Sequence, residues 1–150
     1  MSVYERVLKE IDVYQSRYRR GDVPPLRIGG LYDLSPELGQ PQRACEAKWD
    51  QQWPNSDESG VYVFFDHDLS VLYIGKARIL GARLAAYCAY GPGKTCRLKH
   101  EGWSRTPRYV LTVAVPGNMP WEAAALEEYL IRALDPPDNV LGRLPAEPVA

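Results

Sequence analysis

The spacing of the hydrophobic positions changes from helical to strand-like at residue 60. Near the N-terminus, apolar residues recur three, four and seven positions apart between charged ones, which predicts an amphipathic helix over residues 3–20. A loop rich in glycine and proline follows, and the pattern then predicts a second helix over residues 42–53. Residues 1–59 are therefore expected to form a helical extension packed on the rest of the chain.

From residue 60 onward, β-branched and aromatic residues predict a hairpin, which is followed by a helix, a third strand and a last helix. The expected elements are strands 61–65 and 71–74, helix 79–90, strand 108–115 and helix 121–135. The predicted fold class is α/β (α+β), with a small three-stranded antiparallel sheet flanked by helices. Residues 60–150 are expected to form its ββαβα core, so that the whole chain is a single domain.

Length and composition fit one domain in the cytoplasm. The 150 residues are enough to bury a core without disulfides. No run of 18 apolar residues occurs and the N-terminus is charged from its fifth residue, so we expect neither a membrane span nor a secretory signal. Three cysteines, Cys45, Cys88 and Cys96, are an odd number without a disulfide-framework spacing. They are expected to be free thiols in a reducing compartment.

Charge is distributed unevenly along the chain, although the net charge is only −1. From residue 76 to residue 108 there are eight lysines and arginines and one acid, Glu101, so this part carries a charge of +7. Much of it falls in a long loop expected over residues 91–108. Such a segment in an otherwise acidic chain is either a solvated surface or a phosphate-binding one, and charge alone leaves both interpretations open.

Two triplets in the predicted hairpin carry the most specific pattern of the sequence. Residues 60–62 read GVY and residues 73–75 read YIG, and Lys76 stands directly behind the second triplet. Four further positions follow at characteristic places: Arg83 and Tyr87 one helical turn apart, Glu127 in the last helix, and Asn139 after it. Together with the ββαβα order, these positions resemble the GIY-YIG endonuclease family over residues 60–141, with valine for isoleucine in the first triplet. The position before Asn139 is an aspartate, Asp138, where the family usually has an aromatic residue.

Each of these residues also has an ordinary structural explanation when it is taken alone. Tyrosines in strands, such as Tyr62 and Tyr73, are commonly packing residues. Arg83 on a helix is usually solvated, and Glu127 beside Glu128 is usually part of a charged face. However, Glu127 stands among apolar helix positions, which favours an orientation toward the sheet, where a carboxylate requires a cation.

The resemblance implies an endonuclease that hydrolyses phosphodiester bonds in DNA. Phosphodiester cleavage needs a nucleophilic water, neutralisation of the charge on the phosphoryl oxygens and help for the leaving oxygen. Glu127 would bind one divalent ion, Mg²⁺ or Mn²⁺, and a lone glutamate does not make a two-metal site. Arg83 and Lys76 would contact the scissile phosphate. The partner is DNA, and no membrane partner is expected.

In the resembled family the tyrosine of the first triplet is a proposed general base, so this role is assigned to Tyr62. A free tyrosine, with a pKa of about 10, is a poor base at neutral pH, so we expect neighbouring cations to lower the pKa of Tyr62. Tyr73 and Tyr87 would orient water or phosphate, and exchanged roles of Tyr62 and Tyr73 stay open. Gly60 and Gly75 would let backbone and substrate approach closely.

Asn139 would fix the terminal segment through hydrogen bonds between its side chain and the backbone. The residues expected to contact nucleic acid are Lys76, Arg78, Arg83, Lys94, Arg97 and Lys99. The tryptophans Trp49, Trp53, Trp103 and Trp121 are candidates either for stacking on bases or, more commonly, for packing.

Two other functions compete with the endonuclease. The first is a catalytically inactive module of the GIY-YIG fold that binds nucleic acid through the same cationic segment. It is disfavoured because five polar catalytic candidates are all present, whereas a degenerate site would lack one: Tyr62, Tyr73, Arg83, Tyr87 and Glu127. The second is a zinc module formed by Cys88, Cys96 and His100, which is disfavoured because the spacing lacks a tight cysteine pair and a clear fourth ligand.

Overall fold

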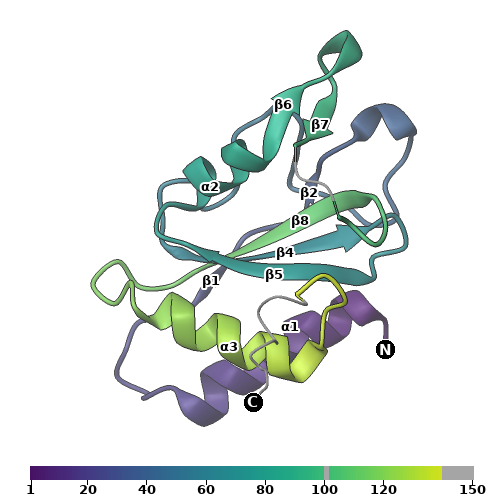
Figure 1. Cartoon of the computed structure of the whole chain (residues 1–150). Coiled ribbons are helices and arrows are strands. Elements are labelled where there is room, and N and C mark those ends of the chain that lie inside the picture. The colour runs from purple at the N-terminus through teal and green to yellow at the C-terminus, as the bar shows by residue number, and fades with distance from the viewer. Residues whose placement is uncertain (100–101, 140–150) are drawn as a thin grey trace, which may run out of the picture.

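A six-stranded sheet forms the centre of the molecule (Figure 1). The computed structural model describes residues 1–99 and 102–139. The order along the sheet is β3-β2-β8-β4-β5, and β1 also pairs with β8. The strands are β1 (Arg27–Ile28), β2 (Tyr32–Asp33), β3 (Ala47–Lys48), β4 (Gly60–Asp66), β5 (Val71–Ala77) and β8 (Pro107–Ala114). β4 is antiparallel to both β5 and β8, so these three strands form the antiparallel sheet that the sequence predicts, and β5 lies at its free edge.

The three additional strands come from the segment before residue 60, and they correct two expectations. The sheet is larger than the predicted three strands, because β1 and β2 pair with β8 and β3 pairs with β2. The helix expected over residues 42–53 is wrong, since this segment contains β3 and turns. Tertiary packing overrides helix propensity here, because Trp53 stacks on Tyr32 with ring centroids 4.2 Å apart. The division of the chain at residue 60 stays a prediction.

One face of the sheet is covered by two helices, α1 (Val3–Val13) and α3 (Glu122–Leu134). Alternate residues of β4 point to this face and join the core with both helices: Val61, Val63 and Phe65. A π-helical turn, Tyr14–Tyr18, continues α1. Ser2 caps α1 in a reciprocal arrangement with Glu5, in which each side chain accepts a hydrogen bond from the other residue's backbone N–H.

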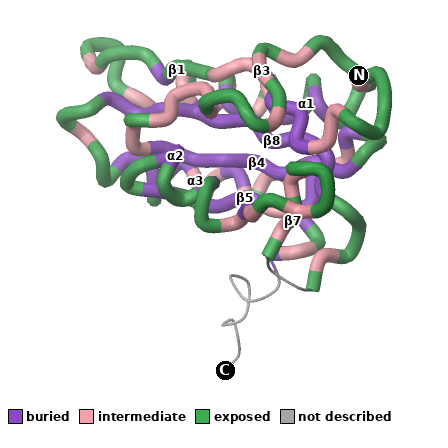
Figure 2. Tube along the Cα trace, turned by 90° about the horizontal axis from the view of Figure 1, so that it is seen from above, coloured by how far each residue is buried: buried purple, intermediate pink, exposed green. Residues whose placement is uncertain are grey.

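The opposite face is covered by α2 (Leu80–Tyr87) and a small hairpin of β6 (Cys88–Tyr90) and β7 (Cys96–Leu98) (Figure 1). Tyr62 and Phe64 of β4 point into this second core. The helix expected over residues 79–90 therefore ends at Tyr87, and the loop expected over residues 91–108 contains β7. Short 3₁₀ helices occur at Pro36–Leu38 and Pro92–Lys94. Because both faces are covered, the long central strands are buried almost throughout (Figure 2).

Two buried ion pairs hold the N-terminal segment to the rest of the fold. Arg19 donates to both carboxylate oxygens of Glu122, the first residue of α3, and the Tyr14 hydroxyl donates to Glu122 Oε2 over 3.0 Å. On the other side of the sheet, Arg108 makes a bidentate pair with Asp33 at 2.9 and 3.0 Å. Buried charges of this kind are tolerated because they are fully paired. Within the described residues, no helix is both long and apolar enough to cross a membrane.

Candidate active site

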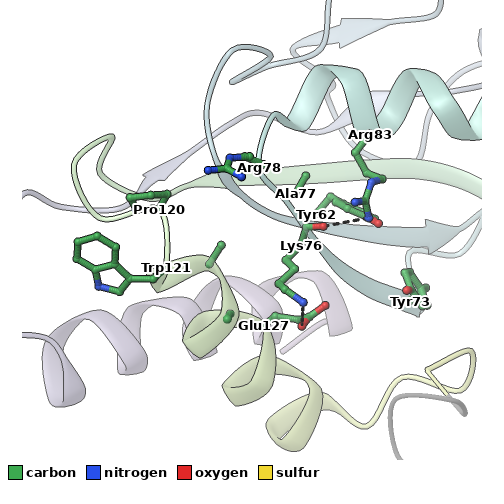
Figure 3. Close-up of a pocket in the computed structure, with 11 residues that line it drawn as sticks. Tyr62, Tyr73, Lys76, Ala77, Arg78, Arg83, Pro120, Trp121 and Glu127 are labelled. Carbon is green, nitrogen blue, oxygen red and sulfur yellow. Dashed lines mark hydrogen bonds and ion pairs between the residues drawn. The ribbon is translucent and has the colours of Figure 1, made fainter.

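A cleft of about 540 Å³ opens at the β5 edge, between α2 on one face of the sheet and α3 on the other (Figure 3). It brings together most of the residues that the sequence names as catalytic. The charged and phenolic side chains lining the cleft are Tyr62, Tyr73, Lys76, Arg78, Arg83 and Glu127. Except for Arg78, which lies between β5 and α2, these residues lie on two strands and two helices, so the tertiary fold assembles them.

The two triplets are coupled through Tyr62 and Gly75, which are direct partners in the β4–β5 register. A Cβ atom on Gly75 would overlap the phenol of Tyr62, and one on Gly60 would overlap the carbonyl of Val113 on β8. These glycines are expected to let backbone and substrate approach closely. This expectation is corrected in part, because the space beside them is filled by a phenol and a backbone carbonyl of the protein itself. The YIG glycine makes room for the GVY tyrosine.

Three phenols are grouped beside the cleft. The hydroxyls of Tyr62 and Tyr87 are 2.9 Å apart, and the ring of Tyr73 lies 6.3 Å from that of Tyr62 between centroids. Burial raises the pKa of Tyr62 above its usual 10, although the neighbouring Tyr87 and Arg83 act to lower it. The expected net lowering of this pKa is therefore wrong for the protein alone, because desolvation outweighs the neighbouring donors.

The two other phenols are less suited to losing a proton. Burial raises the pKa of Tyr73 to about 12, and its hydrogen bond to Tyr87 raises it further. Burial also raises the pKa of Tyr87, and so does its hydrogen bond to Tyr62. Tyr62 differs from both in that its hydrogen bond to Tyr87 and the nearby Arg83 act to lower its pKa against the effect of burial.

Glu127 reaches the cleft from α3. Its side chain is 21% exposed, and one carboxylate oxygen lies 3.7 Å from the Lys76 ammonium. Burial raises the pKa of Glu127 and Lys76 partly offsets this. The neighbouring Glu128 points away, is 67% exposed and pairs with Arg132 on its own helix. The exposures of the two glutamates thus agree with the orientation toward the sheet that the apolar helix positions around Glu127 predict.

A single divalent ion fits the chemistry of this position. Glu127 is a hard oxygen donor that lines the cleft, and its ion pair with Lys76 is a long one at 3.7 Å. In residues 1–99 and 102–139, no group of three or more His, Cys, Asp or Glu side chains is arranged to hold a metal. An ion there would hence rely on one carboxylate, with water and substrate oxygens as its other ligands.

Asn139 binds the backbone of β5 next to the cleft. Its side-chain oxygen accepts from the Ile74 N–H and its amide donates to the Ile74 carbonyl, both at 2.8 Å. Asp138, which replaces the family's aromatic residue, donates its backbone N–H to the Leu72 carbonyl and accepts from the Ser104 N–H. The segment therefore satisfies part of an edge strand that would otherwise expose unpaired backbone groups.

The cationic segment separates into three structural groups. Lys76, Arg78 and Arg83 line the cleft. Lys94, Arg97 and Lys99 are exposed on or beside the β6–β7 hairpin and lie outside the cleft lining. Arg105 pairs with Asp66 and Asp68, and Arg108 is buried against Asp33. The last two arginines are thus neutralised, so the charge available to a ligand is smaller than the sequence indicates.

The zinc alternative finds no further support. Cys88 and Cys96 are neighbours on the β6–β7 hairpin, and both are free thiols. The third proposed ligand, His100, lies outside the described residues. Sequence reasoning also missed a supporting group, Arg19 with Tyr14 and Glu122, because Glu122 is more than 100 positions from the other two and no local spacing signals their contact.

Comparison with known proteins agrees with the site geometry. Residues 58–140 match the model of the UvrC-like GIY-YIG domain. The UvrABC system protein C of Ruegeria sp. is 37% identical over 110 residues, which is 73% of this chain. Those of Pseudomonas syringae pv. tomato and Aliarcobacter butzleri are 38% identical over 88 residues and 34% over 100, covering 59% and 62% of the chain.

With the triplets, the cleft and this match together, the chain belongs to the UvrC-like GIY-YIG domain family. It spans only 14 to 16% of the length of these three relatives.

Proposed function

We propose that this chain is a metal-dependent endonuclease that hydrolyses phosphodiester bonds in DNA. The observation that carries the proposal is the convergence of Tyr62, Arg83 and Glu127 on one cleft from three different elements. Family membership supports a nuclease, because the relatives are named as components of the UvrABC system. A phosphate in this cleft would meet the guanidinium, the ammonium and the phenols at once.

In this proposal Tyr62 is the general base. Its oxygen would accept the proton of the attacking water, and the donors Tyr87 and Arg83 would stabilise the resulting phenolate. Tyr73, whose ring lies 6.3 Å from that of Tyr62 between centroids, would orient the water or the phosphate. The raised pKa of Tyr62 keeps it protonated in the free protein at neutral pH, so the base form must develop as the loaded cleft gains positive charge.

Arg83 and Lys76 are proposed to hold the scissile phosphate. The guanidinium of Arg83 also donates to the Lys76 carbonyl over 3.3 Å, which ties the start of α2 to the end of β5. A planar fork and a point charge on neighbouring elements suit the oxygens of one phosphate. Glu127 would hold one Mg²⁺ or Mn²⁺, which when bound stabilises charge on the phosphoryl and leaving oxygens.

The inactive nucleic-acid-binding module remains the second candidate, because one observation favours it. The Lys76 ammonium lies where a cation would pair with Glu127. However, this lysine is 52% exposed, and such ion pairs contribute about 1 kcal/mol or less, so a divalent ion readily displaces it.

The test is a cleavage assay on plasmid, single-stranded, branched and RNA substrates with Mg²⁺, with Mn²⁺ and with EDTA. We expect cleavage of DNA in either metal and none in EDTA. Binding of DNA without cleavage of any substrate in either metal would favour the inactive module instead.

A further inference from the structure

Trp121 is an exposed tryptophan at the far end of the catalytic cleft. Its side chain is 68% exposed and lines the cleft together with Pro120 and Arg78. Figure 3 shows it at the opposite end from Tyr73. The other three tryptophans each pack on an aromatic ring: Trp53 on Tyr32, Trp49 on Tyr90 and Trp103 on Phe64, at 4.2, 5.4 and 5.2 Å between centroids. Packing explains those three and leaves Trp121 unexplained.

The backbone beneath Trp121 is held firmly in place. Pro120 precedes it, and the carbonyls of Met119, Pro120 and Trp121 accept the N–H groups of residues 122, 123 and 124. The next residue, Glu122, is buried and bound by Arg19 and Tyr14 from the N-terminal segment. The indole is therefore presented from a fixed position, which reduces the entropy lost when a ligand stacks on it.

The spacing along α3 relates this indole to the candidate reaction centre. Trp121 precedes Glu127 by six positions, so at 1.5 Å per residue the two are about 9 Å apart along the helix axis. Successive nucleotides of one DNA strand rise about 3.4 Å each. Consider a DNA strand whose scissile phosphate lies at Arg83 and Glu127. A base about three nucleotides from that phosphate would then lie at Trp121.

We propose that Trp121 and Arg78 form a nucleobase-binding subsite, in which the indole stacks on one unpaired base near the scissile phosphate. Arg78 would contact the phosphate of the same nucleotide. In a continuous duplex both faces of each base are covered by neighbouring bases, so only an unpaired or extruded base offers a free face. The inference rests on the proposed function and makes the preferred substrate DNA with a locally unpaired strand.

The experiment measures binding in EDTA, where no cleavage occurs. The probes are two duplexes of equal length that contain 2-aminopurine, one with this base in a single-nucleotide bulge and one fully paired. Trp121→Ala is compared with Trp121→Phe and with Leu38→Ala, which removes another exposed apolar side chain, 65% exposed and outside the cleft lining. Because Trp121 and Leu38 are both exposed, all three variants are expected to fold.

We expect Trp121→Ala to bind the bulged duplex about tenfold more weakly than the parent does and to bind the paired duplex with little change. The quenching of 2-aminopurine fluorescence in the bulged duplex should also be lost. Trp121→Phe should keep most of both signals, and Leu38→Ala should keep all. Equal affinities and equal quenching for parent and Trp121→Ala would overturn the subsite. Failure of the parent to cleave any DNA in Mg²⁺ would instead overturn the proposed function, which this binding assay does not measure.

Discussion

The phenol of Tyr62 occupies the space that a side chain on Gly75 would need, and the two residues face each other across the β4–β5 pair. The glycine of one triplet thereby sets the position of the tyrosine of the other. This explains why the two triplets occur together, since a tyrosine without the facing glycine would have to turn elsewhere.

Gly75→Ala is expected to displace the Tyr62 phenol and to lower cleavage by on the order of 10², because a shift of about 1 Å in a reacting group has an effect of this size. The free energy of unfolding should fall by about 1 to 3 kcal/mol through overpacking. Single-turnover cleavage and urea unfolding measure the two effects. Gly21→Ala is the control, since no atom lies within 4 Å of its Cβ position. Parental cleavage by Gly75→Ala would contradict the coupling.

The pH dependence of cleavage tests Tyr62 as the base. Burial raises the pKa of Tyr62 in the free protein, so the phenol is protonated at neutral pH, and the single-turnover rate should rise with pH until it reaches the pKa that Tyr62 has in the loaded cleft. Tyr62→Phe should lose roughly 10² or more in rate and flatten the profile, while DNA affinity in EDTA barely changes. Tyr73→Phe should lose less. A larger loss in Tyr73→Phe would exchange the two roles, and an unaltered profile in Tyr62→Phe would refute the assignment.

Reversal of Lys94, Arg97 and Lys99 to glutamate should weaken DNA binding and flatten its salt dependence. Three lost phosphate contacts lower the slope of log K against log salt by up to about 2.7. The control reverses Lys9, Arg17 and Arg20, which are equally exposed but belong to the N-terminal segment. If both triple variants showed the parental slope, the β6–β7 cations would be merely solvated.

Arg108 is expected to stabilise the fold rather than bind DNA. Replacing it by alanine leaves the Asp33 carboxylate buried without its partner, which should lower the free energy of unfolding by about 3 to 5 kcal/mol. Arg20→Ala removes an arginine that is 81% exposed and pairs with the exposed Asp22, so it should cost about 1 kcal/mol or less. Urea unfolding of the two variants would contradict this account if their losses were equal.

Glu127→Gln should stabilise the metal-free protein at neutral pH. Burial raises the pKa of Glu127, so its contribution to stability is present below the unfolded pKa near 4.5 and is lost as pH rises through the folded pKa. At pH 7 the ionised carboxylate is therefore a net cost, which glutamine removes. Mg²⁺ at roughly 100 times its Kd should stabilise the parent by about 2.7 kcal/mol and leave the variant unchanged. If Mg²⁺ raised the Tm of the parent and of Glu127→Gln equally, the ion would bind at another site.

The sequence predicts the parts of the fold whose patterns are local. β4, β5 and β8 are continuous β-branched and aromatic runs, and α3 has clear boundaries, so each was found close to its observed position. The two-residue strands β1, β2 and β3 carry no alternation, and they form because β8 offers backbone partners to β1 and β2 and β2 offers them to β3. The catalytic candidates were found through the triplets, whereas the burial of Arg108 depends on Asp33, which is 75 positions away.

The most direct test of the central claim compares plasmid cleavage by Glu127→Ala and Glu128→Ala in Mg²⁺. The two glutamates are adjacent on α3, but only Glu127 faces the cleft, while Glu128 pairs with Arg132 on the helix surface. We predict that Glu127→Ala abolishes cleavage and that Glu128→Ala keeps at least half of the parental rate, roughly. Cleavage by Glu127→Ala at the parental rate, in protein shown to be folded, would contradict a metal-dependent site built on this residue.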